Sequence, residues 1–325
     1  MPKILLSNHY DEEVFQIVKE SVPDGFEIEM LDAMSRENFI EKVRDADYIL
    51  ASGRMKIDNY IITAAKRLKM IQRTGVGIDS LDLESLCRHG IPVYVNAGVN
   101  AVSVAEHTIL LMLASLRNLI QIDAQIRSGK WEKQKQGIRT YELYDKTVGL
   151  IGAGNIGLRV AERLKCFGTK VIYYSIPRLS REEELRYNMT YCSLDMLLQK
   201  ADVISLHCPL MKETKHMIGV KELQKMKSSA VLVNTSRGGL VDQEALIQAL
   251  QTRKISMAAL DVYEEEPIPE ECELKIMKNV ILTPHIGGVT YDSYRNMIDS
   301  AMQNIRLFEQ GNLVEIEKNK LSVES

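Results

Sequence analysis

The sequence predicts an α/β protein built from two doubly wound parallel-sheet domains. Short apolar runs alternate with helix-length amphipathic stretches along the chain, which is typical of parallel strands joined by helices. The chain has 325 residues, more than a single hydrophobic core usually supports, so two domains are expected. A GxGxxG pattern begins at Gly152, between an apolar run and a helical pattern, as expected where a strand of such a sheet meets its helix.

The composition indicates a globular protein whose partners are small molecules and further copies of itself. Hydrophobic residues make up 45% and charged residues 26% of the chain, and the net charge is −3. Without a basic run, nothing attracts the chain to nucleic acid or to an anionic membrane. The first apolar run is too short for a signal peptide, and no stretch approaches the ~18 apolar residues of a membrane span, so a cytoplasmic location is expected. The five cysteines have no CxxC spacing, and no HExxH occurs, so we expect reduced thiols and no metal site.

The first third of the chain has five apolar runs that we expect to be strands. They span residues 3–7, 26–31, 46–52, 68–75 and 91–96. A single long helix is expected to begin near Ala101 and to run through about residue 129. Because much of its surface is apolar, it is expected either to be buried or to form a subunit interface.

A second series of apolar runs predicts six strands, the number of a dinucleotide-binding domain. They span residues 147–154, 169–175, 201–208, 229–236, 256–262 and 279–285. An amphipathic helix is expected over residues 291–308, and a polar tail follows it from Glu315.

The glycine turn has the sequence context of a phosphate-binding site. Gly152 permits a tight turn, Gly154 lets the backbone approach a pyrophosphate, and Gly157 lets the helix pack on the strand. Asn155 and Ile156 open the helix, whose free N–H groups would face the anion. The alternative is a glycine-rich turn that holds no ligand.

The second strand of this series ends in a residue that does not exclude a phosphate. An NAD-binding domain usually has an acidic residue there to hold the adenine ribose, whereas this strand ends in Ser175, with Arg178 and Arg181 beyond it. The sequence therefore leaves room for the 2′-phosphate of NADP. The alternative is that both arginines are solvated loop residues.

Four polar side chains follow strands of the second series and could converge on one crevice. In open α/β sheets, ligands bind outside the carboxyl ends of the strands. His285 is suited to exchange a proton near neutral pH, and Glu266 could orient and stabilise its charged ring. Arg237 offers a planar fork for a carboxylate, and Asp261 ends its strand. With a bound dinucleotide, these groups would suit hydride transfer to a 2-oxo acid.

Taken together, these stretches resemble the D-isomer-specific 2-hydroxyacid dehydrogenases. The matching stretches are 97–108 (AGVNAVSVAEHT), 149–157 (GLIGAGNIG), 207–214 (HCPLMKET), 233–242 (VNTSRGGLVD), 259–267 (ALDVYEEEP) and 283–288 (TPHIGG). The resemblance implies two Rossmann-like domains, with a discontinuous substrate-binding domain over residues 1–98 and 289–325 and an NAD(P)-binding domain over residues 99–288. It also implies a homodimer and a D-hydroxy acid product.

The resemblance further implies the roles of individual residues. It implies that Arg237, Glu266 and His285 are catalytic. It implies that the cofactor, NAD or NADP, contacts the glycine turn and several further residues: Ser175, Pro209, Thr235, Asp261 and Gly287. Arg178 and Thr214 are further candidates for contact with the cofactor.

The resemblance also bears on the substrate. It implies that the turn with Val76 and Gly77 binds the substrate carboxylate, although a purely structural turn is an alternative. Arg54 lies close to, but displaced from, the arginine that phosphoglycerate dehydrogenases carry at this point. Glyoxylate and hydroxypyruvate are therefore as consistent with the sequence as 3-phosphoglycerate.

Two other functions of the same fold are rivals to this interpretation. A formate dehydrogenase of this family lacks a carboxylate beside the histidine, so Glu266 speaks against it. An NAD(H)-binding transcriptional corepressor is the rival from a different class, and the lack of a basic segment or of long polar extensions speaks against it.

Overall fold

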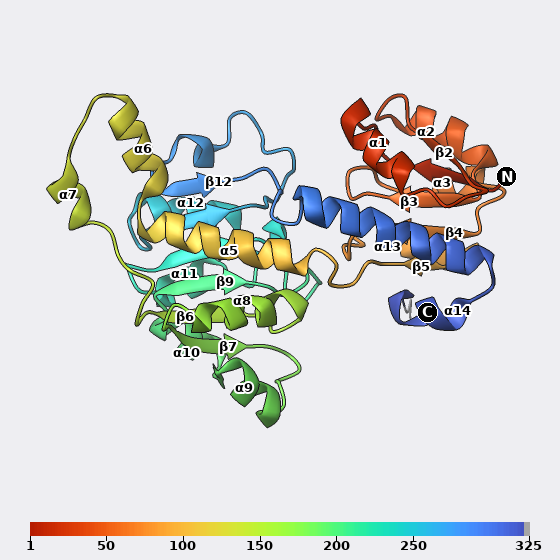
Figure 1. Cartoon of the computed structure of the whole chain (residues 1–325). Helices are drawn as coiled ribbons and strands as arrows, with labels where there is room; N and C mark the ends of the chain where they lie inside the picture. The colour runs from red at the N-terminus through yellow and green to blue at the C-terminus, as the bar shows by residue number, and fades with distance from the viewer. Residues whose placement is uncertain (322–325) are drawn as a thin grey trace. The chain divides into compact units, whose positions relative to one another are not determined.

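The computed structural model describes residues 1–321 and divides the chain into two compact units. Unit 1 consists of residues 1–100 and of the chain from Tyr291 onward, and unit 2 consists of residues 101–290. The predicted domain boundaries, after residues 98 and 288, lie two residues before those of the units. Figure 1 shows that each unit has its own sheet with helices packed on it.

Unit 1 contains a parallel five-stranded sheet in the order β2-β1-β3-β4-β5. The strands are β1 Lys3–Leu6, β2 Glu27–Met30, β3 Tyr48–Ala51, β4 Met70–Arg73 and β5 Val93–Tyr94. The helices are α1 Glu12–Glu20, α2 Arg36–Lys42, α3 Asn59–Ala64, α4 Leu83–Arg88, α13 Tyr291–Glu309 and α14 Leu313–Ile316. All five strands predicted for the first third of the chain are present. Their order reverses between β1 and β3, so the loops after these two strands lie at the topological switch point.

Alternate residues along each strand of unit 1 face opposite cores. One core joins Leu5 and Ile49 to α2, α3 and α4, and the other joins Ile4 and Tyr48 to α1, α13 and α14. The predicted polar tail begins in α14 and continues along the edge of the sheet, where Lys320 forms a bridge with Tyr94. The last four residues of the tail lie outside the described residues.

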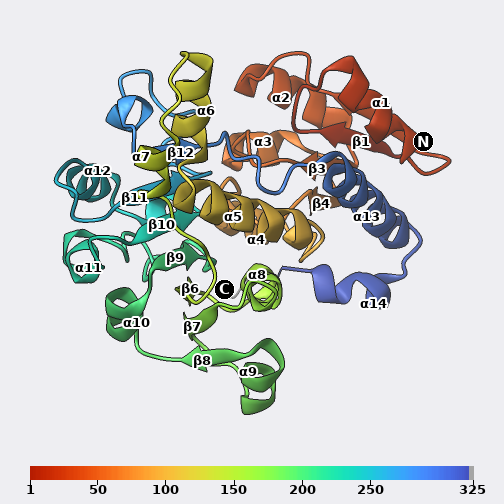
Figure 2. The same cartoon turned by 60° about the vertical axis from the view of Figure 1, so that its left-hand side comes forward.

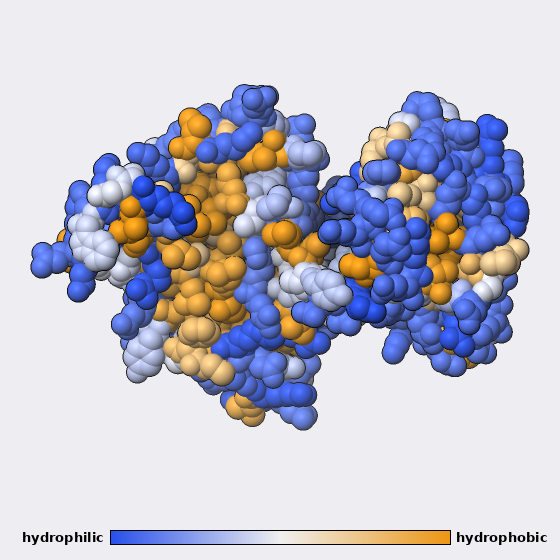
Figure 3. All heavy atoms as spheres, turned by 45° about the horizontal axis from the view of Figure 1, so that its top comes forward, coloured by the Kyte–Doolittle hydropathy of each residue, from blue (hydrophilic) through white to orange (hydrophobic). Residues whose placement is uncertain are grey.

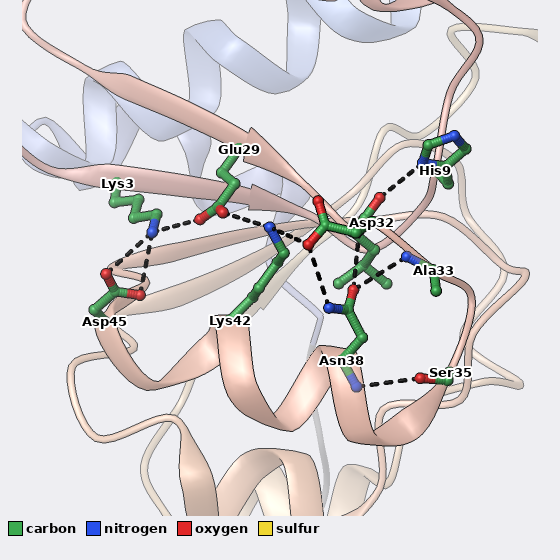
Figure 4. Close-up of polar contacts among 10 residues, drawn as sticks. Lys3, His9, Glu29, Asp32, Ala33, Ser35, Asn38, Lys42 and Asp45 are labelled. Carbon is green, nitrogen blue, oxygen red and sulfur yellow. Dashed lines mark hydrogen bonds and ion pairs between the residues drawn. The ribbon is translucent and has the colours of Figure 1, made fainter.

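Charged side chains link strand β2 to its neighbours in unit 1 (Figure 4). The carboxylate of Glu29 forms ion pairs with the ammonium groups of Lys3 and Lys42, each at 2.5 Å. Lys3 also pairs with Asp45 at 3.0 Å, and Lys42 pairs with Asp32 at 2.8 Å. Burial would raise the pKa of Glu29, but the two lysines lower it below its usual value. The network therefore ties the edge strand β2 to β1 and α2 while its carboxylates are charged.

Unit 2 contains a parallel seven-stranded sheet in the order β12-β11-β10-β9-β6-β7-β8. The strands are β6 Thr147–Ile151, β7 Lys170–Tyr174, β8 Met189–Tyr191, β9 Val203–Leu206, β10 Val231–Asn234, β11 Met257–Leu260 and β12 Val280–Leu282. The prediction of six strands is wrong by one, because β8 was missed. It has only three residues and lies at the sheet edge, where pairing with β7 rather than an apolar run defines it.

Helices cover both faces of the sheet in unit 2, as Figure 2 shows. They are α5 Ala101–Leu116, α6 Leu119–Arg127, α7 Lys133–Gly137, α8 Asn155–Lys165, α9 Arg181–Tyr187, α10 Leu194–Lys200, α11 Val220–Lys225 and α12 Gln243–Gln251. One core packs α10, α11 and α12 against the sheet, and the other packs α5 and α8. At Gly149 in β6 a Cβ would lie 2.5 Å from a methyl group of Leu197, so this glycine lets α10 approach the strand.

The prediction of one long helix after Ala101 is wrong, because the chain breaks between α5 and α6. Asn118 has a left-handed backbone with φ of 50°, a conformation that asparagine tolerates better than most residues. Its side chain donates to the carbonyl of Arg139 at 3.0 Å, which holds the bend. No single helix among residues 1–321 is long and apolar enough to cross a membrane, and α5 and α6, which reach that length only together, are bent by 60° at the break.

Candidate active site

The glycine turn after β6 has the shape that a pyrophosphate requires. Gly152 has φ of 103°, and a Cβ there would lie 2.6 Å from the backbone of His207. A Cβ on Gly157 would lie 2.3 Å from the carbonyl oxygen of Gly152. Gly154, in contrast, has open space around it and caps α8. Asn155 and Ile156 form the first positions of α8. The first and third glycines thus allow close packing, and the second leaves room for an anion at the helix start.

Further predicted cofactor residues follow strands β7, β9 and β10. Ser175 directly follows β7, and its hydroxyl accepts a hydrogen bond from the N–H of Ala153 at 3.4 Å. Beyond β9, the hydroxyl of Thr214 donates to the carbonyl of Pro209 at 2.8 Å. Thr235 follows β10, and its hydroxyl lies 2.9 Å from that of Thr108 in α5. All these residues therefore lie beyond carboxyl ends of strands in unit 2.

Arg237 lies in an extended segment that follows β10, and the side chain of Asn234 fixes this segment. Asn234 is buried, and its amide nitrogen donates to the carbonyl of Arg237 at 2.8 Å. Its amide oxygen accepts from the N–H of Ser236 at 3.1 Å. Gly238 follows, and a Cβ there would lie 1.9 Å from the backbone of Tyr263. Arg237 is therefore presented by a turn that packs directly on the backbone after β11.

Glu266 and His285 form a hydrogen-bonded pair in unit 2. The two atoms, Nδ1 of His285 and Oε2 of Glu266, lie 2.7 Å apart, and the nitrogen donates because an ionised carboxylate only accepts. The other oxygen of Glu266 accepts from the N–H of Tyr263 at 3.0 Å. Burial would raise the pKa of Glu266, but these two hydrogen bonds and the charges of His285 and Arg237 lower it below its usual value. A charged Glu266 thus holds one ring nitrogen of His285 and leaves Nε2 for another partner.

His285 has an unusual backbone that Asp261 maintains. Its φ is 53°, a strained value for a residue with a side chain. The N–H of His285 donates to the carbonyl of Asp261 at 2.8 Å. The carboxylate of Asp261 accepts from the N–H groups of Ile286 at 2.9 Å and of Gly287 at 2.8 Å. Asp261 therefore anchors the loop that presents His285, and its predicted contact with the cofactor stays a prediction.

Two residues that the sequence interpretation did not assign to the site complete this anchor. The hydroxyl of Thr283 donates to Asp261 at 2.6 Å, and it accepts from Nε2 of His107 at 3.1 Å. The pKa of Asp261 is lowered because the hydrogen bonds from His107, Thr283 and the loop outweigh the effect of burial. Both residues lie within stretches that carry the family resemblance, at 97–108 and 283–288. That position was the signal that could have identified them.

The predicted substrate residues lie in unit 1, beyond the carboxyl ends of its strands. Arg54 is exposed and follows β3, next to the switch point. Val76 is 47% exposed and Gly77 is half-buried; both follow β4. The carbonyl of Gly75 in the same turn accepts from the N–H of Asn96 at 3.2 Å. The binding of substrate by Arg54, Val76 and Gly77 stays a prediction.

The geometry within unit 2 suits proton exchange beside a dinucleotide. His285 can give or take a proton at Nε2 while Glu266 fixes its tautomer. The positive charge of Arg237 also helps to lower the pKa of Glu266. Among residues 1–321, no cluster of three or more potential metal ligands is found.

Comparison with known proteins identifies the family. Residues 109–287 match the model of the D-isomer specific 2-hydroxyacid dehydrogenase NAD-binding domain. The chain is 39% identical over 320 residues to a glyoxylate reductase of Thermococcus litoralis, covering 96% of this chain and 95% of that one. It is 39% identical over 296 residues to a D-3-phosphoglycerate dehydrogenase of Archaeoglobus fulgidus, covering 91% of this chain and 55% of that one.

A solved structure agrees with these relatives. The D-lactate dehydrogenase of Aquifex aeolicus, complexed with NAD and lactic acid, has a TM-score of 0.85 and 31% identity to this chain. The comparison covers 99% of this chain and all of that one. With the family model matching more than half of the chain, and a relative at 39% identity over nearly its whole length, this protein belongs to the D-isomer-specific 2-hydroxyacid dehydrogenases.

Proposed function

We propose that this NAD(P)-dependent dehydrogenase reduces a small unphosphorylated 2-oxo acid, of the glyoxylate or hydroxypyruvate kind, to the D-2-hydroxy acid. The observation that carries the proposal is the 2.7 Å contact between Nδ1 of His285 and Glu266. Reduction of a carbonyl needs a proton for the developing alkoxide, and a tethered imidazole supplies it. Oxidation of formate needs no such proton, so the pair favours a 2-oxo acid over formate.

Each polar group would have a distinct part in the reaction. The nicotinamide, when bound, supplies or accepts the hydride. His285 donates the proton from Nε2 in reduction and takes it back in oxidation. Glu266 orients the ring and stabilises its charged form. Arg237 binds the substrate carboxylate and polarises the neighbouring carbonyl.

The most direct test is a panel of 2-oxo acids assayed with NADH and with NADPH. We expect turnover of glyoxylate and hydroxypyruvate, and we expect chiral analysis of the hydroxypyruvate product to give the D isomer. A 3-phosphorylated acid as the best substrate would contradict the unphosphorylated class. An L product would contradict the stereochemistry.

Ser175 makes NADPH an acceptable cofactor, at least as good as NADH. A hydroxyl at the end of β7 can bond to a phosphate oxygen, whereas a carboxylate there would repel it. Ser175→Asp should therefore lower kcat/KM with NADPH by about 10-fold or more relative to NADH. Ser193→Asp is a matched control, because it adds the same charge at the N-cap of α10, where aspartate is favoured. A clear preference of the natural protein for NADH would refute the prediction.

The exposed apolar side chains of residues 102–144 support a homodimer. These include Val102, Leu110, Leu119, Ile120, Ile126, Trp131, Ile138, Tyr141 and Tyr144. Figure 3 shows hydrophobic side chains gathered over one face of unit 2, and patches of this kind mark association surfaces.

Light scattering at micromolar concentration should give about twice the 36.8 kDa of one chain. Leu110→Arg places a charge in the middle of the apolar set and should shift the protein toward monomer. Met196→Arg is the control, because Met196 is 45% exposed on α10, which packs on the opposite face of the sheet from α5. A monomeric natural protein would rule out the dimer.

A further inference from the structure

Arg178, the first charged side chain after β7, is held by a buried carboxylate. Its Nε donates to Oε1 of Glu184 at 2.8 Å, and its Nη2 donates to Oε2 at 3.2 Å. The guanidinium also lies 4.7 Å from the centre of the Tyr191 ring. A bidentate ion pair and a cation–π contact therefore fix the direction of a side chain that is 55% exposed.

Glu184 is in turn attached to the interior of the sheet. Its side chain is only 2% exposed, although it belongs to the short helix α9. Oε1 accepts from the hydroxyl of Tyr173 at 2.8 Å, and this hydroxyl accepts from the N–H of Leu179 at 3.1 Å. Tyr173 lies in β7 and is fully buried. The connection from strand β7 to the guanidinium thus passes through buried groups.

The partners of Glu184 favour its charged form. The hydrogen bond from Arg178 is the largest cause that lowers the pKa of Glu184 to about 2, followed by the bond from Tyr173. The loop before α9 is also fixed, because Ser180 and Glu183 form a reciprocal capping box. Arg178 is thus tethered at a defined place rather than sampling many rotamers.

We propose that Glu184 is a positioning residue for the 2′-phosphate of NADPH, and that it acts through Arg178. The proposal rests on the cofactor site proposed above. In a sheet of this order, the end of the second strand, here β7, faces the adenine ribose. Glu184 engages two of the five donors of the guanidinium, and the fork is thereby oriented before a phosphate binds. A mobile arginine would instead lose side-chain entropy when the phosphate binds, and this loss would weaken binding.

Two other roles of Glu184 give different results when its charge is removed. If Glu184 mainly neutralises Arg178, then Glu184→Gln would strengthen binding of a 2′-phosphate. If it only ties the loop to α9, then binding of adenosine ligands with and without that phosphate would change equally. Positioning predicts weaker binding only of the ligand that carries a 2′-phosphate. Glutamine keeps the shape of glutamate but offers Arg178 one acceptor oxygen in place of two.

Calorimetric titration of the full chain with two nucleotides separates these roles. Adenosine 2′,5′-bisphosphate carries the 2′-phosphate, and adenosine 5′-monophosphate lacks it. Glu184→Gln should weaken the bisphosphate about 3- to 10-fold, the effect of ordering one side chain on binding, and should leave the monophosphate within about two-fold. The double variant with Arg178→Ala should bind the bisphosphate no more weakly than Arg178→Ala alone, because Glu184 acts only through Arg178.

Two further variants control for charge and for folding. Arg181→Ala removes a cation that also reaches Glu184, at 3.4 Å, but whose side chain is 76% exposed. It should leave the ratio of the two affinities within about two-fold. Tyr173→Phe keeps the ring but removes the hydroxyl that holds Glu184. It should also weaken binding of the bisphosphate, and it therefore tests the proposal if Glu184→Gln fails to fold.

The outcomes distinguish this proposal from the proposed reaction. Neither nucleotide contains nicotinamide, so the titrations do not depend on activity toward any 2-oxo acid. The positioning role is overturned if Glu184→Gln binds the bisphosphate as well as or better than the natural protein, or if both nucleotides change equally. If Arg178→Ala leaves the bisphosphate unchanged, the 2′-phosphate does not bind at Arg178 and the positioning role fails, whereas the acceptance of NADPH argued from Ser175 is still tested by its own variant.

Discussion

Replacement of His285 with alanine is expected to lower kcat/KM for 2-oxo acid reduction by about 10³-fold, within the range that general acid–base catalysis contributes. Nε2 is the proton donor in the proposed reaction, and alanine has no group to replace it. Binding of the reduced cofactor, measured by fluorescence titration, should change little because the glycine turn belongs to other strands. Near-normal turnover on every accepted substrate would show that His285 is not the acid.

His216 provides a matched control for this variant. It also forms a histidine–glutamate pair in unit 2, with 2.6 Å between its Nε2 and Glu264. His216→Ala removes a pair of the same chemistry from outside the proposed catalytic group. It should keep kcat/KM within about threefold of the natural protein, an effect of less than 1 kcal/mol.

The carboxylate of the catalytic pair can be tested separately through pH. The lowered pKa of Glu266 keeps it charged near neutral pH, where it stabilises the protonated form of His285. Glu266→Gln removes this charge and with it the attraction that favours a proton on the neighbouring ring. The alkaline limb of the pH profile for reduction should therefore move to lower pH, and an unmoved profile would contradict the pairing.

Gly238→Ala is expected to disrupt both the fold around Arg237 and catalysis. The added Cβ would lie 1.9 Å from the carbonyl of Tyr263 and 2.5 Å from the nitrogen of Glu264, so backbone must move on one side. Such overpacking lowers the free energy of unfolding by about 1–3 kcal/mol or more. It also displaces Arg237, and a misplacement of about 1 Å can reduce turnover by about 10²-fold. Denaturant unfolding and steady-state kinetics measure the two effects.

The next residue shows whether the effect is specific to backbone contact. The three atoms nearest to a Cβ on Gly239 all belong to the side chain of Leu210, the first at 3.1 Å, and this side chain can rotate. Gly239→Ala should therefore keep most of the stability and activity. Equal losses in both variants would contradict this explanation. They would indicate that the whole segment tolerates no side chain, and that the contact of Gly238 with the backbone after β11 has no special role.

The sequence predicted most of the architecture because apolar periodicity reports burial directly. The β6 turn illustrates this, since the strand predicted within residues 147–154 and the helix expected after the glycine turn are both present. Strand β8 and the break at Asn118 were missed because neither depends on local periodicity. One is defined by pairing with β7, and the other by a hydrogen bond to Arg139.

The amino-acid sequence predicts the α/β class, the family and the polar residues at the strand ends. These follow from residue type and from spacing along the chain. The pairing of Glu266 with His285 was predicted, and the structure confirms it at 2.7 Å. Other partners are visible only in the folded chain, where His107 and Thr283 anchor Asp261 and Glu184 pairs with Arg178. Such partners depend on which loops a parallel sheet brings to one edge, and that arrangement is set by packing between segments far apart in the chain.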